Sequence, residues 1–391
     1  MKSNEILHVN NTDIYMKKII IPLLVILGMA TACKKNNDPI TNNPPQLHLT
    51  VQWDKKYSYW FNEPSNIHNL VATADGGAAV FFSWFTDAAC GTCLLKTDGN
   101  GVTEFQHEFT SSEFGCGDAS LLQTADNGFI VYGNNTYPVF GKIDISGNIL
   151  WTKQANYHQL SHLNCMIEKP TGGYLALATG YGSIFLLDLN VAGDTNRCFQ
   201  VADSLEIPEA VQLEYNHAGE IVLTYSGRIN GDYMSVVKTV DTNFNQIWSL
   251  PFAQSGHGLI QKSFYINTDN SIMVAGRIWT NGMGDDQGYI ASVSPTGSLI
   301  WSHQIAEMQD AALDIVLAPS GGYYVVGEHD IGITKINSNG DVLWRESLEP
   351  TNQLGPSGNT LKVSGNAIYF FGSVFEFPAV EESPELIKFS E

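Results

Sequence analysis

Two stretches of the chain share one pattern of apolar and polar positions. Residues 128–151 and 321–344 each begin with glycine followed by an aromatic residue, run through apolar residues to Lys-Ile, and close on Leu-Trp after a polar turn. Short apolar runs bounded by glycine-bearing turns are typical of strands buried on both faces. The pattern therefore predicts a strand, a loop, a strand, a tight turn and a further strand in each stretch.

Weaker copies of this unit fill most of the chain. The aromatic residues that close the units recur roughly every fifty residues, a period that fits one four-stranded blade of a β-propeller. The glycine-rich turns within the units recur with the same period, and both markers give seven units. The closing residues are Trp53, Phe105, Trp151, Phe199, Trp248, Trp301 and Trp344. Because a large ring buries much area, we expect Trp151, Trp248, Trp301 and Trp344 to pack between neighbouring blades.

The two ends of the repeat array complement each other. The last unit, residues 361–389, lacks a closing strand, whereas residues 46–53 form a closing strand with no unit before it. Pairing them in one blade closes the ring and removes open sheet edges. We therefore predict an all-β β-propeller of seven four-stranded blades over residues 47–391, with the N-terminal strand completing the last blade. Six or eight blades, or an open solenoid, are the alternatives.

The residues before the repeats have the features of a leader. Met16 and two lysines precede an apolar stretch, residues 19–30, which is too short to span a bilayer and is typical of a signal peptide. The small residues before Cys33 resemble a bacterial lipobox, although Ala30 stands where leucine is usual. That resemblance implies cleavage before Cys33 and its acylation by more than one chain, which stable anchoring requires. An ordinary secretory signal with a chance cysteine is the alternative.

The leader divides the chain into three parts. We take Met16 as the true start, with a tolerated extension of the signal peptide as the alternative reading of residues 1–15. Residues 1–33 then form the signal region, and residues 34–46 form a polar tether with three prolines that we expect to be disordered. This organisation predicts a lipid-anchored protein of the cell envelope, in the outer membrane and facing the periplasm or the surface.

The closing turns are similar to those of a known repeat superfamily. Residues 142–151, KIDISGNILW, and residues 335–344, KINSNGDVLW, resemble the quinoprotein-type (PQQ-like) repeats and the delta-60 repeats of bacterial secreted and lipid-anchored propellers. The resemblance covers residues 46–391 and implies the fold more than an activity. Its non-enzymatic members include the propeller lipoprotein of the outer-membrane assembly machinery.

The resemblance does not extend to a cofactor. Quinoprotein dehydrogenases are much longer and carry vicinal cysteines and calcium ligands, whereas Cys90 and Cys93 are not vicinal. The repeat motif is also incomplete, because Phe199 replaces a closing tryptophan and Asn245 stands where the turn glycine belongs. We therefore predict no cofactor and no metal.

Charge restricts the classes of partner. The chain has 40 acidic and 20 basic residues and a formal net charge of −20. Such a surface repels phosphate backbones, so nucleic acid is not an expected partner. The acidity is explained most simply by solubility, and a cation or a basic partner is the alternative.

One face of the predicted ring gathers aromatic and acidic residues. In a propeller, the loops that join consecutive blades and the loops between second and third strands share one face, and function concentrates on such loops. Aromatic rings beside carboxylates suit a sugar or a peptide, although several rings could simply pack the loops down. Tyr137 and Tyr181 belong to further loops of this face. The predicted ligand-binding face consists of Tyr57, Tyr59, Trp60, Phe61, Trp84, Phe85, Trp279, Asp285, Asp286, His329 and Asp330.

Three cysteines fall on the same face. Cys90 and Cys93 lie in one loop and Cys116 in the next, so in an oxidising compartment Cys116 could pair with either of the other two. A strained or redox-active Cys90–Cys93 pair and a zinc site with His158 or His162 are alternatives. Cys165 and Cys198 fall on predicted strands, and we expect them to be reduced and buried.

No motif in the sequence specifies a reaction. A nucleophile elbow, a His-Glu-x-x-His helix, a P-loop and a Rossmann fingerprint are all absent from the sequence. Polar residues on the inner strands, such as Lys262 and Asp314, could line a channel at the axis. We therefore predict a monomeric binding or scaffolding module for an envelope protein or a glycan. A propeller-type polysaccharide hydrolase or lyase is the first alternative, and a thiol redox protein is the second.

Overall fold

The computed structural model describes residues 48–57, 69–85, 89–117, 119–134, 137–155, 160–229, 232–252, 258–279, 287–305, 308, 311–327, 332–347, 360–376 and 381–391. Leu47–Glu391 forms one compact unit. The predicted signal region, residues 1–33 with Cys33, and the whole predicted tether, residues 34–46, lie outside the described residues. Within the described ranges, no helix has the length and apolar character needed to cross a membrane.

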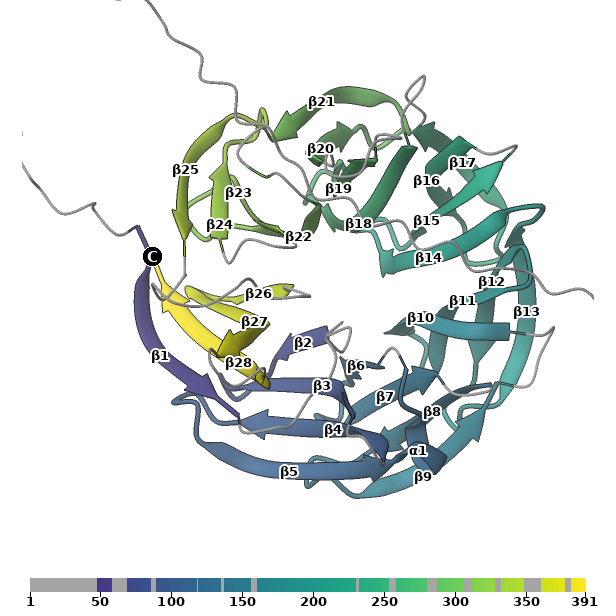
Figure 1. Ribbon diagram of the computed structural model, residues 1–391. Coiled ribbons are helices and arrows are strands. Elements are labelled where there is room, and N and C mark those ends of the chain that lie inside the picture. Colours follow the sequence, from purple (N-terminus) through teal and green to yellow (C-terminus); the bar gives the residue numbers. More distant parts are fainter. Residues whose placement is uncertain are drawn as a thin grey trace, which may run out of the picture. The chain divides into compact units, whose positions relative to one another are not determined.

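The unit consists of seven four-stranded antiparallel sheets arranged in a ring (Figure 1). This confirms the predicted seven-bladed propeller. In each blade the first strand is innermost and the fourth is outermost (Figure 1). Blades 1 to 3 contain β2 (Asn69–Ala72), β3 (Ala78–Phe85), β4 (Cys90–Thr97) and β5 (Thr103–Thr110); β6 (Ala119–Gln123), β7 (Phe129–Asn134), β8 (Pro138–Ile143) and β9 (Ile149–Gln154); and β10 (Leu160–Glu168), β11 (Tyr174–Gly180), β12 (Ser183–Leu189) and β13 (Thr195–Ala202).

The remaining blades repeat this order. Blades 4 to 6 contain β14 (Glu206–Tyr215), β15 (Ile221–Ile229), β16 (Asp232–Val240) and β17 (Gln246–Phe252); β18 (Gly258–Ile266), β19 (Ile272–Trp279), β20 (Gln287–Val293) and β21 (Leu299–Ile305); and β22 (Ala312–Leu317), β23 (Tyr323–Gly327), β24 (Gly332–Ile336) and β25 (Val342–Ser347). Blade 7 contains β26 (Thr360–Ser364), β27 (Ala367–Glu376), β28 (Glu381–Ser390) and β1 (Thr50–Lys56).

The N-terminal strand closes the ring as predicted. β1 pairs antiparallel with β28 and becomes the outer strand of blade 7. The residues before β1 are held by blade 6, because the backbone amides of His48 and Leu49 both donate to Glu346 Oε2 at 3.1 Å. The His48 ring also stacks on Trp344, with ring centroids 4.6 Å apart. Closure therefore joins the first and last blades through both backbone pairing and side-chain contacts.

Hydrophobic clusters fill the interfaces between neighbouring blades. Between blades 7 and 1, for example, Tyr369 and Phe371 pack with Val80 and Phe82, and all four are buried. A one-turn helix, α1 (Ser111–Phe114), connects blade 1 to blade 2, and its Phe114 packs edge-on against other rings of that interface. Apolar area is thus buried between blades, which explains why the second and third strands are apolar on both faces.

The four closing tryptophans Trp151, Trp248, Trp301 and Trp344 pack against the clusters between blades, as predicted. Trp248 of blade 4 lies on the turn of blade 5, where a Cβ added to Gly297 would be 2.5 Å from its ring. Its indole N–H donates to the Pro295 carbonyl of the same turn at 3.1 Å. Gly297 also has a positive φ of 80°. Only glycine meets both requirements without strain, because it lacks a Cβ.

One detail of the repeat analysis is wrong. Asn245 does not occupy the glycine position of the turn in blade 4, because Asp241 N–H donates to the Asn245 carbonyl and the left-handed residue is Phe244, with φ 71°. The closing position of blade 3 is also corrected: Arg197, not Phe199, lies opposite Asp188 and four residues after Gly193, as Trp151 follows Gly147. The Arg197 guanidinium lies 4.3 Å from the centroid of the Phe244 ring, and the Phe199 ring lies 5.9 Å from it. An arginine on a phenylalanine therefore replaces the contact of tryptophan with glycine at this interface.

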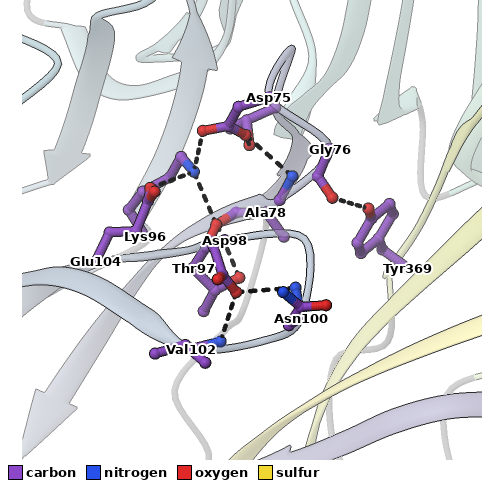
Figure 2. A network of polar contacts seen from close by, with 12 residues as sticks. Asp75, Gly76, Ala78, Lys96, Thr97, Asp98, Asn100, Val102, Glu104 and Tyr369 are labelled. Atoms are coloured by element: carbon purple, nitrogen blue, oxygen red, sulfur yellow. Dashed lines mark hydrogen bonds and ion pairs between the residues drawn. The ribbon is translucent and has the colours of Figure 1, made fainter.

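Buried lysines tie the third strands to the turns. Lys96, whose side chain is 5% exposed, lies 2.7 Å from Asp75 and 2.8 Å from Glu104 (Figure 2). Desolvation raises the pKa of Asp75, but hydrogen bonds from Lys96, Thr73 and the Gly77 amide outweigh it and lower that pKa to about 2. The carboxylate therefore stays charged and satisfies the lysine, as a buried charge requires.

The same arrangement recurs around the ring. A lysine lies opposite the closing aromatic residue in blades 1, 2, 6 and 7. In blade 3 an acidic residue takes the position of the lysine: Asp188 lies opposite Arg197 and forms ion pairs with Lys169 at 2.5 Å and with Arg197 at 3.2 Å. The four lysines are Lys96, Lys142, Lys335 and Lys388.

Candidate functional site

The loop face is the end of the ring at which second strands connect to third strands and outer strands connect to the next blade. Much of the predicted ligand-binding face falls outside the described residues. Phe85 and Trp279 are described only as the last residues of β3 and β19. The predicted residues outside the described ranges are Tyr59, Trp60, Phe61, Asp285, Asp286, His329 and Asp330.

Two of the predicted rings pack into the interface between blades 7 and 1. Tyr57 and Trp84 are half-buried and contact the hydrophobic cluster there. Burial raises the pKa of Tyr57 to about 12. The Tyr57 hydroxyl and the Trp84 indole N–H are both enclosed without a hydrogen-bond partner in the described protein. Both rings are therefore partly buried against the interface between blades 7 and 1.

Exposed tyrosines occupy the loop face of blades 2 and 3. Tyr137 is 45% exposed and Tyr181 is 82% exposed. Tyr181 lies at the tip of a tight hairpin, because Gly180 pairs with Ser183 across it. The rings that remain available in the described part of this face thus come from two neighbouring blades.

A disulfide bond covalently links two chain connections on the loop face. Cys90 at the start of β4 is bonded to Cys116, which follows α1. Cys93 is fully buried in the interface between blades 7 and 1. This pairing rules out a Cys90–Cys93 bond in this state. Burial also raises the pKa of the Cys165 thiol to about 12 and that of the Cys198 thiol, so neither has the character of a reactive thiolate.

A cleft opens between blades 4 and 5 at their loop-face ends. Its volume is about 450 Å³, which lies within the range of small-ligand sites. Phe252 and Tyr289 pack edge to face in its wall, with ring centroids 6.5 Å apart. The lining residues are Leu250, Pro251, Phe252, Leu259, Ile278, Tyr289, Leu299, Ser302, His303 and Gln304.

Two of the polar residues of the cleft, Ser302 and His303, already have partners. Ser302 is hydrogen-bonded to Tyr289, whose pKa is raised by burial. The His303 ring stacks on Trp301, with centroids 5.0 Å apart, and its Nε2 lies 3.0 Å from the Asn339 carbonyl oxygen. No carboxylate lines the cleft among the residues that the structure describes. The cleft therefore offers apolar walls and a polar rim, without an acid and base directed at one point.

A second polar cluster lies on the innermost strands of blades 4 to 7. Asp314 on β22 accepts hydrogen bonds from Ser263 Oγ at 2.7 Å and Thr360 Oγ1 at 2.8 Å, and Lys362 Nζ lies 3.7 Å away. Gln212 on β14 accepts from Ser263 Oγ and from the Phe264 amide. The cluster therefore links four consecutive blades near the axis.

Glu214 is the unusual group of this axial cluster. Desolvation raises its pKa, Asp314 raises it further, and the charge of Lys362 and a hydrogen bond from Gln212 oppose the rise. A carboxyl with a raised pKa next to a lysine and a second carboxylate can act as a proton donor or acceptor. No group of three or more metal-ligating side chains occurs in the described ranges.

The sequence analysis did not identify the cleft or two residues of the axial cluster. It predicted Asp314 and Lys262 to lie near the axis, but not Glu214 and Lys362. The available signal was weak, because each is a single polar residue on a strand with mixed composition. The cleft gives no signal in the sequence, because residues from two blades form it.

Comparisons with known proteins show the fold. No family profile matches the chain, and no curated protein matches it. The solved structure of virginiamycin B lyase from Staphylococcus aureus with quinupristin has a TM-score of 0.59 and 11% identity, and the match covers 85% of this chain and 98% of that one. The structure of the polysaccharide lyase Uly1 has a TM-score of 0.58 and 8% identity over 85% of this chain and 91% of that one.

A third propeller structure is about equally similar. The Cps50 (Swd1) propeller domain of Myceliophteria thermophila has a TM-score of 0.57 and 8% identity over 88% of this chain and 99% of that one. At such low identity the likeness shows the β-propeller fold alone, which enzymes and non-enzymatic domains share.

Proposed function

We propose that this protein is a lipid-anchored binding module of the cell envelope that holds a partner protein or a glycan on its loop face. The observation that carries the proposal is the cleft between blades 4 and 5. It has the size of a ligand site, and its histidine and serine are held in structural contacts. A rigid, disulfide-linked ring with such a cleft is better suited to binding a ligand than to catalysing its cleavage.

The sequence supports the location. The signal peptide and the small residues before Cys33 favour acylation and anchoring in the outer membrane. The resemblance of the closing turns to PQQ-like and delta-60 repeats fits secreted and lipid-anchored propellers. Changing Cys33 to serine should release the protein from membranes into the soluble fraction, and continued membrane retention would contradict the anchor.

The binding proposal is tested by capture and by a glycan array. The anchored protein is used to capture partners from its native envelope, and the soluble domain from residue 46 is applied to the array. A stoichiometric protein with a blank array identifies a protein-binding module. Array signals that disappear on Tyr181→Ala identify a glycan-binding module, because Tyr181 is the most exposed ring described on this face. Failure of both experiments would contradict the proposal.

A lyase acting on a polysaccharide is the second candidate. It is favoured by the raised pKa of Glu214 beside Asp314 and Lys362, and two structural neighbours are lyases. In this case Glu214→Gln should abolish cleavage of a polysaccharide panel and leave the circular dichroism spectrum unchanged. Absence of any cleavage by the wild-type protein would remove this candidate.

A further inference from the structure

The end of the ring opposite the loop face carries an exposed aliphatic residue on every blade. We call this end the turn face, because it holds the turns that join first to second strands and third to fourth strands. Each of these residues lies in or beside the turn that leads into an outer strand, and each is between 47% and 68% exposed. Together they form the apolar rim, which consists of Val51, Val102, Leu150, Val191, Ile247, Ile300 and Leu343.

The fold does not require aliphatic residues at these positions. In every blade the outer strand shifts register by one residue just before its closing residue, so one residue bulges out of the sheet there. Blades 7, 1 and 3 hold Gln52, Glu104 and Asn196 at the bulge, and all three are exposed. Packing therefore does not explain the exposed aliphatic residues at the bulges of the other four blades, which are Leu150, Ile247, Ile300 and Leu343.

The chain that precedes the ring joins it at the turn face. β1 begins there, because Thr50 pairs with Ser390 at the end of the third strand of blade 7. His48 stacks on Trp344, which directly follows Leu343 of the apolar rim. Cys33 lies only fifteen residues before His48 in the sequence. A lipid on Cys33 would therefore bring the apolar rim within reach of the bilayer that holds it.

We infer that the apolar rim docks on a zwitterionic lipid bilayer and so directs the loop face away from the membrane. This inference rests on the proposed lipid anchor and assigns the anchored protein an orientation. A bilayer suits the rim because one aliphatic side chain per blade, spread around a ring, matches a flat apolar surface better than a single pocket of a partner. The half-buried closing tryptophans follow the bulge residues directly, and tryptophan rings are favourable at the membrane interface.

The charge of the turn face determines which lipids it tolerates. Asp98, Asp144 and Asp241 lie in the turns beside the rim and accept hydrogen bonds from the amides of those turns. Carboxylates are ionised at neutral pH and repel anionic headgroups. Burial of apolar side chains must therefore drive the docking, and anionic lipid should weaken it at low salt.

Quenching of tryptophan fluorescence by brominated phosphatidylcholine measures the docking. The protein from residue 34 carries an N-terminal hexahistidine tag, and phosphatidylcholine vesicles contain a nickel-chelating lipid that holds the tag. The protein is then kept at the bilayer whether or not Cys33 is acylated in the native protein. Trp151, Trp301 and Trp344 directly follow residues of the apolar rim, so docking should quench part of the tryptophan emission. We expect less quenching when phosphatidylglycerol replaces part of the phosphatidylcholine at low salt.

Two variants make the result specific. The rim variant combines Leu150→Gln, Ile247→Gln, Ile300→Gln and Leu343→Gln, and its fold should persist because blade 7 already holds glutamine at the bulge. It should lose the quenching although the tag still holds it. Without the tag, each substitution should weaken vesicle binding by about fivefold. Ile207→Gln is the matched control, because Ile207 is 62% exposed at the start of β14 on the loop face, and it should leave the quenching unchanged.

Four results would overturn the inference. They are the absence of quenching in the tethered wild-type protein, equal quenching of the wild-type protein and the rim variant, loss of quenching in Ile207→Gln, and a wild-type dimer in sedimentation that the rim variant abolishes. The last result would assign the rim to a second copy of the chain. If the wild-type protein captures an envelope partner but shows no quenching, the inference fails while the proposed binding function stands.

Discussion

Two substitutions separate the two energetic contributions to the contact between a closing tryptophan and a turn glycine. These contributions are backbone strain at the glycine and packing against the ring. Gly297 and Gly219 both have φ of 80°. A Cβ at Gly297 would lie 2.5 Å from the Trp248 ring, whereas a Cβ at Gly219 would meet no atom within 4 Å. Alanine at either position therefore suffers the same backbone strain, and only Gly297→Ala also disturbs packing.

The structure gives the expected magnitudes. A left-handed alanine costs about 1 kcal/mol, so Gly219→Ala should lower the free energy of unfolding by about that amount. Gly297→Ala adds overpacking against the ring, about 1–3 kcal/mol, and loss of the Trp248 hydrogen bond to Pro295, about 1 kcal/mol. We expect a total of about 3–5 kcal/mol for Gly297→Ala.

Urea unfolding followed by tryptophan fluorescence measures both values. The wild-type protein and both variants are compared at one pH, and circular dichroism checks that each variant is folded. Equal destabilisation by the two variants would refute the reasoning, because it would mean that the contact between blades adds nothing to backbone strain.

Three further predictions concern the ring. The pKa values of Asp75, Asp126 and Glu391 are lowered to about 2 from ordinary values of 3.8, 3.8 and 4.5, so the stability from these carboxylates is complete above about pH 5 and is lost as the pH falls toward 2. A urea midpoint that stays constant between pH 6 and pH 2 would contradict this. Replacing Cys90 and Cys116 by serine should lower the free energy of unfolding by about 3 kcal/mol, because the disulfide closes a loop of 26 residues. An unchanged urea midpoint would show that the disulfide does not stabilise the ring. Deleting β1 should cause association in size-exclusion chromatography, because it exposes the edge of β28; a monodisperse, folded product would show that closure is dispensable.

The repeat pattern was sufficient for the architecture. Closing aromatics such as Trp151 recur at fixed places because every blade presents the same interface to its neighbour, and residues 46–53 could be matched to the last blade because each lacked what the other supplied. The assignment of the turn glycine's position to Asn245 was wrong by one residue. Gly147 precedes Trp151 by four residues, and the same offset from Trp248 gives Phe244, which adopts the left-handed conformation with φ 71°. The residue type at this position, phenylalanine in place of glycine, is what obscured the repeat.

The candidate site was less accessible to sequence reasoning. Side chains from loops were expected to gather on one face, but Tyr57 and Trp84 turn into the interface between blades, where burial of their rings is favourable. The cleft depends on how Phe252 of blade 4 meets Tyr289 of blade 5, and the axial cluster joins Gln212 to Asp314 through Ser263. Such contacts connect residues far apart in the sequence, and no periodicity reports them.

The central proposal is tested most directly by comparing which envelope proteins the wild-type protein and a variant with a filled cleft each capture. The anchored wild-type protein and Gln304→Trp are immobilised at equal amounts, and the proteins that each retains are quantified. The proposal predicts one stoichiometric partner that the wild-type protein retains and that is lost when the cleft is filled. Retention of the same proteins by both, or of none by either, would contradict it.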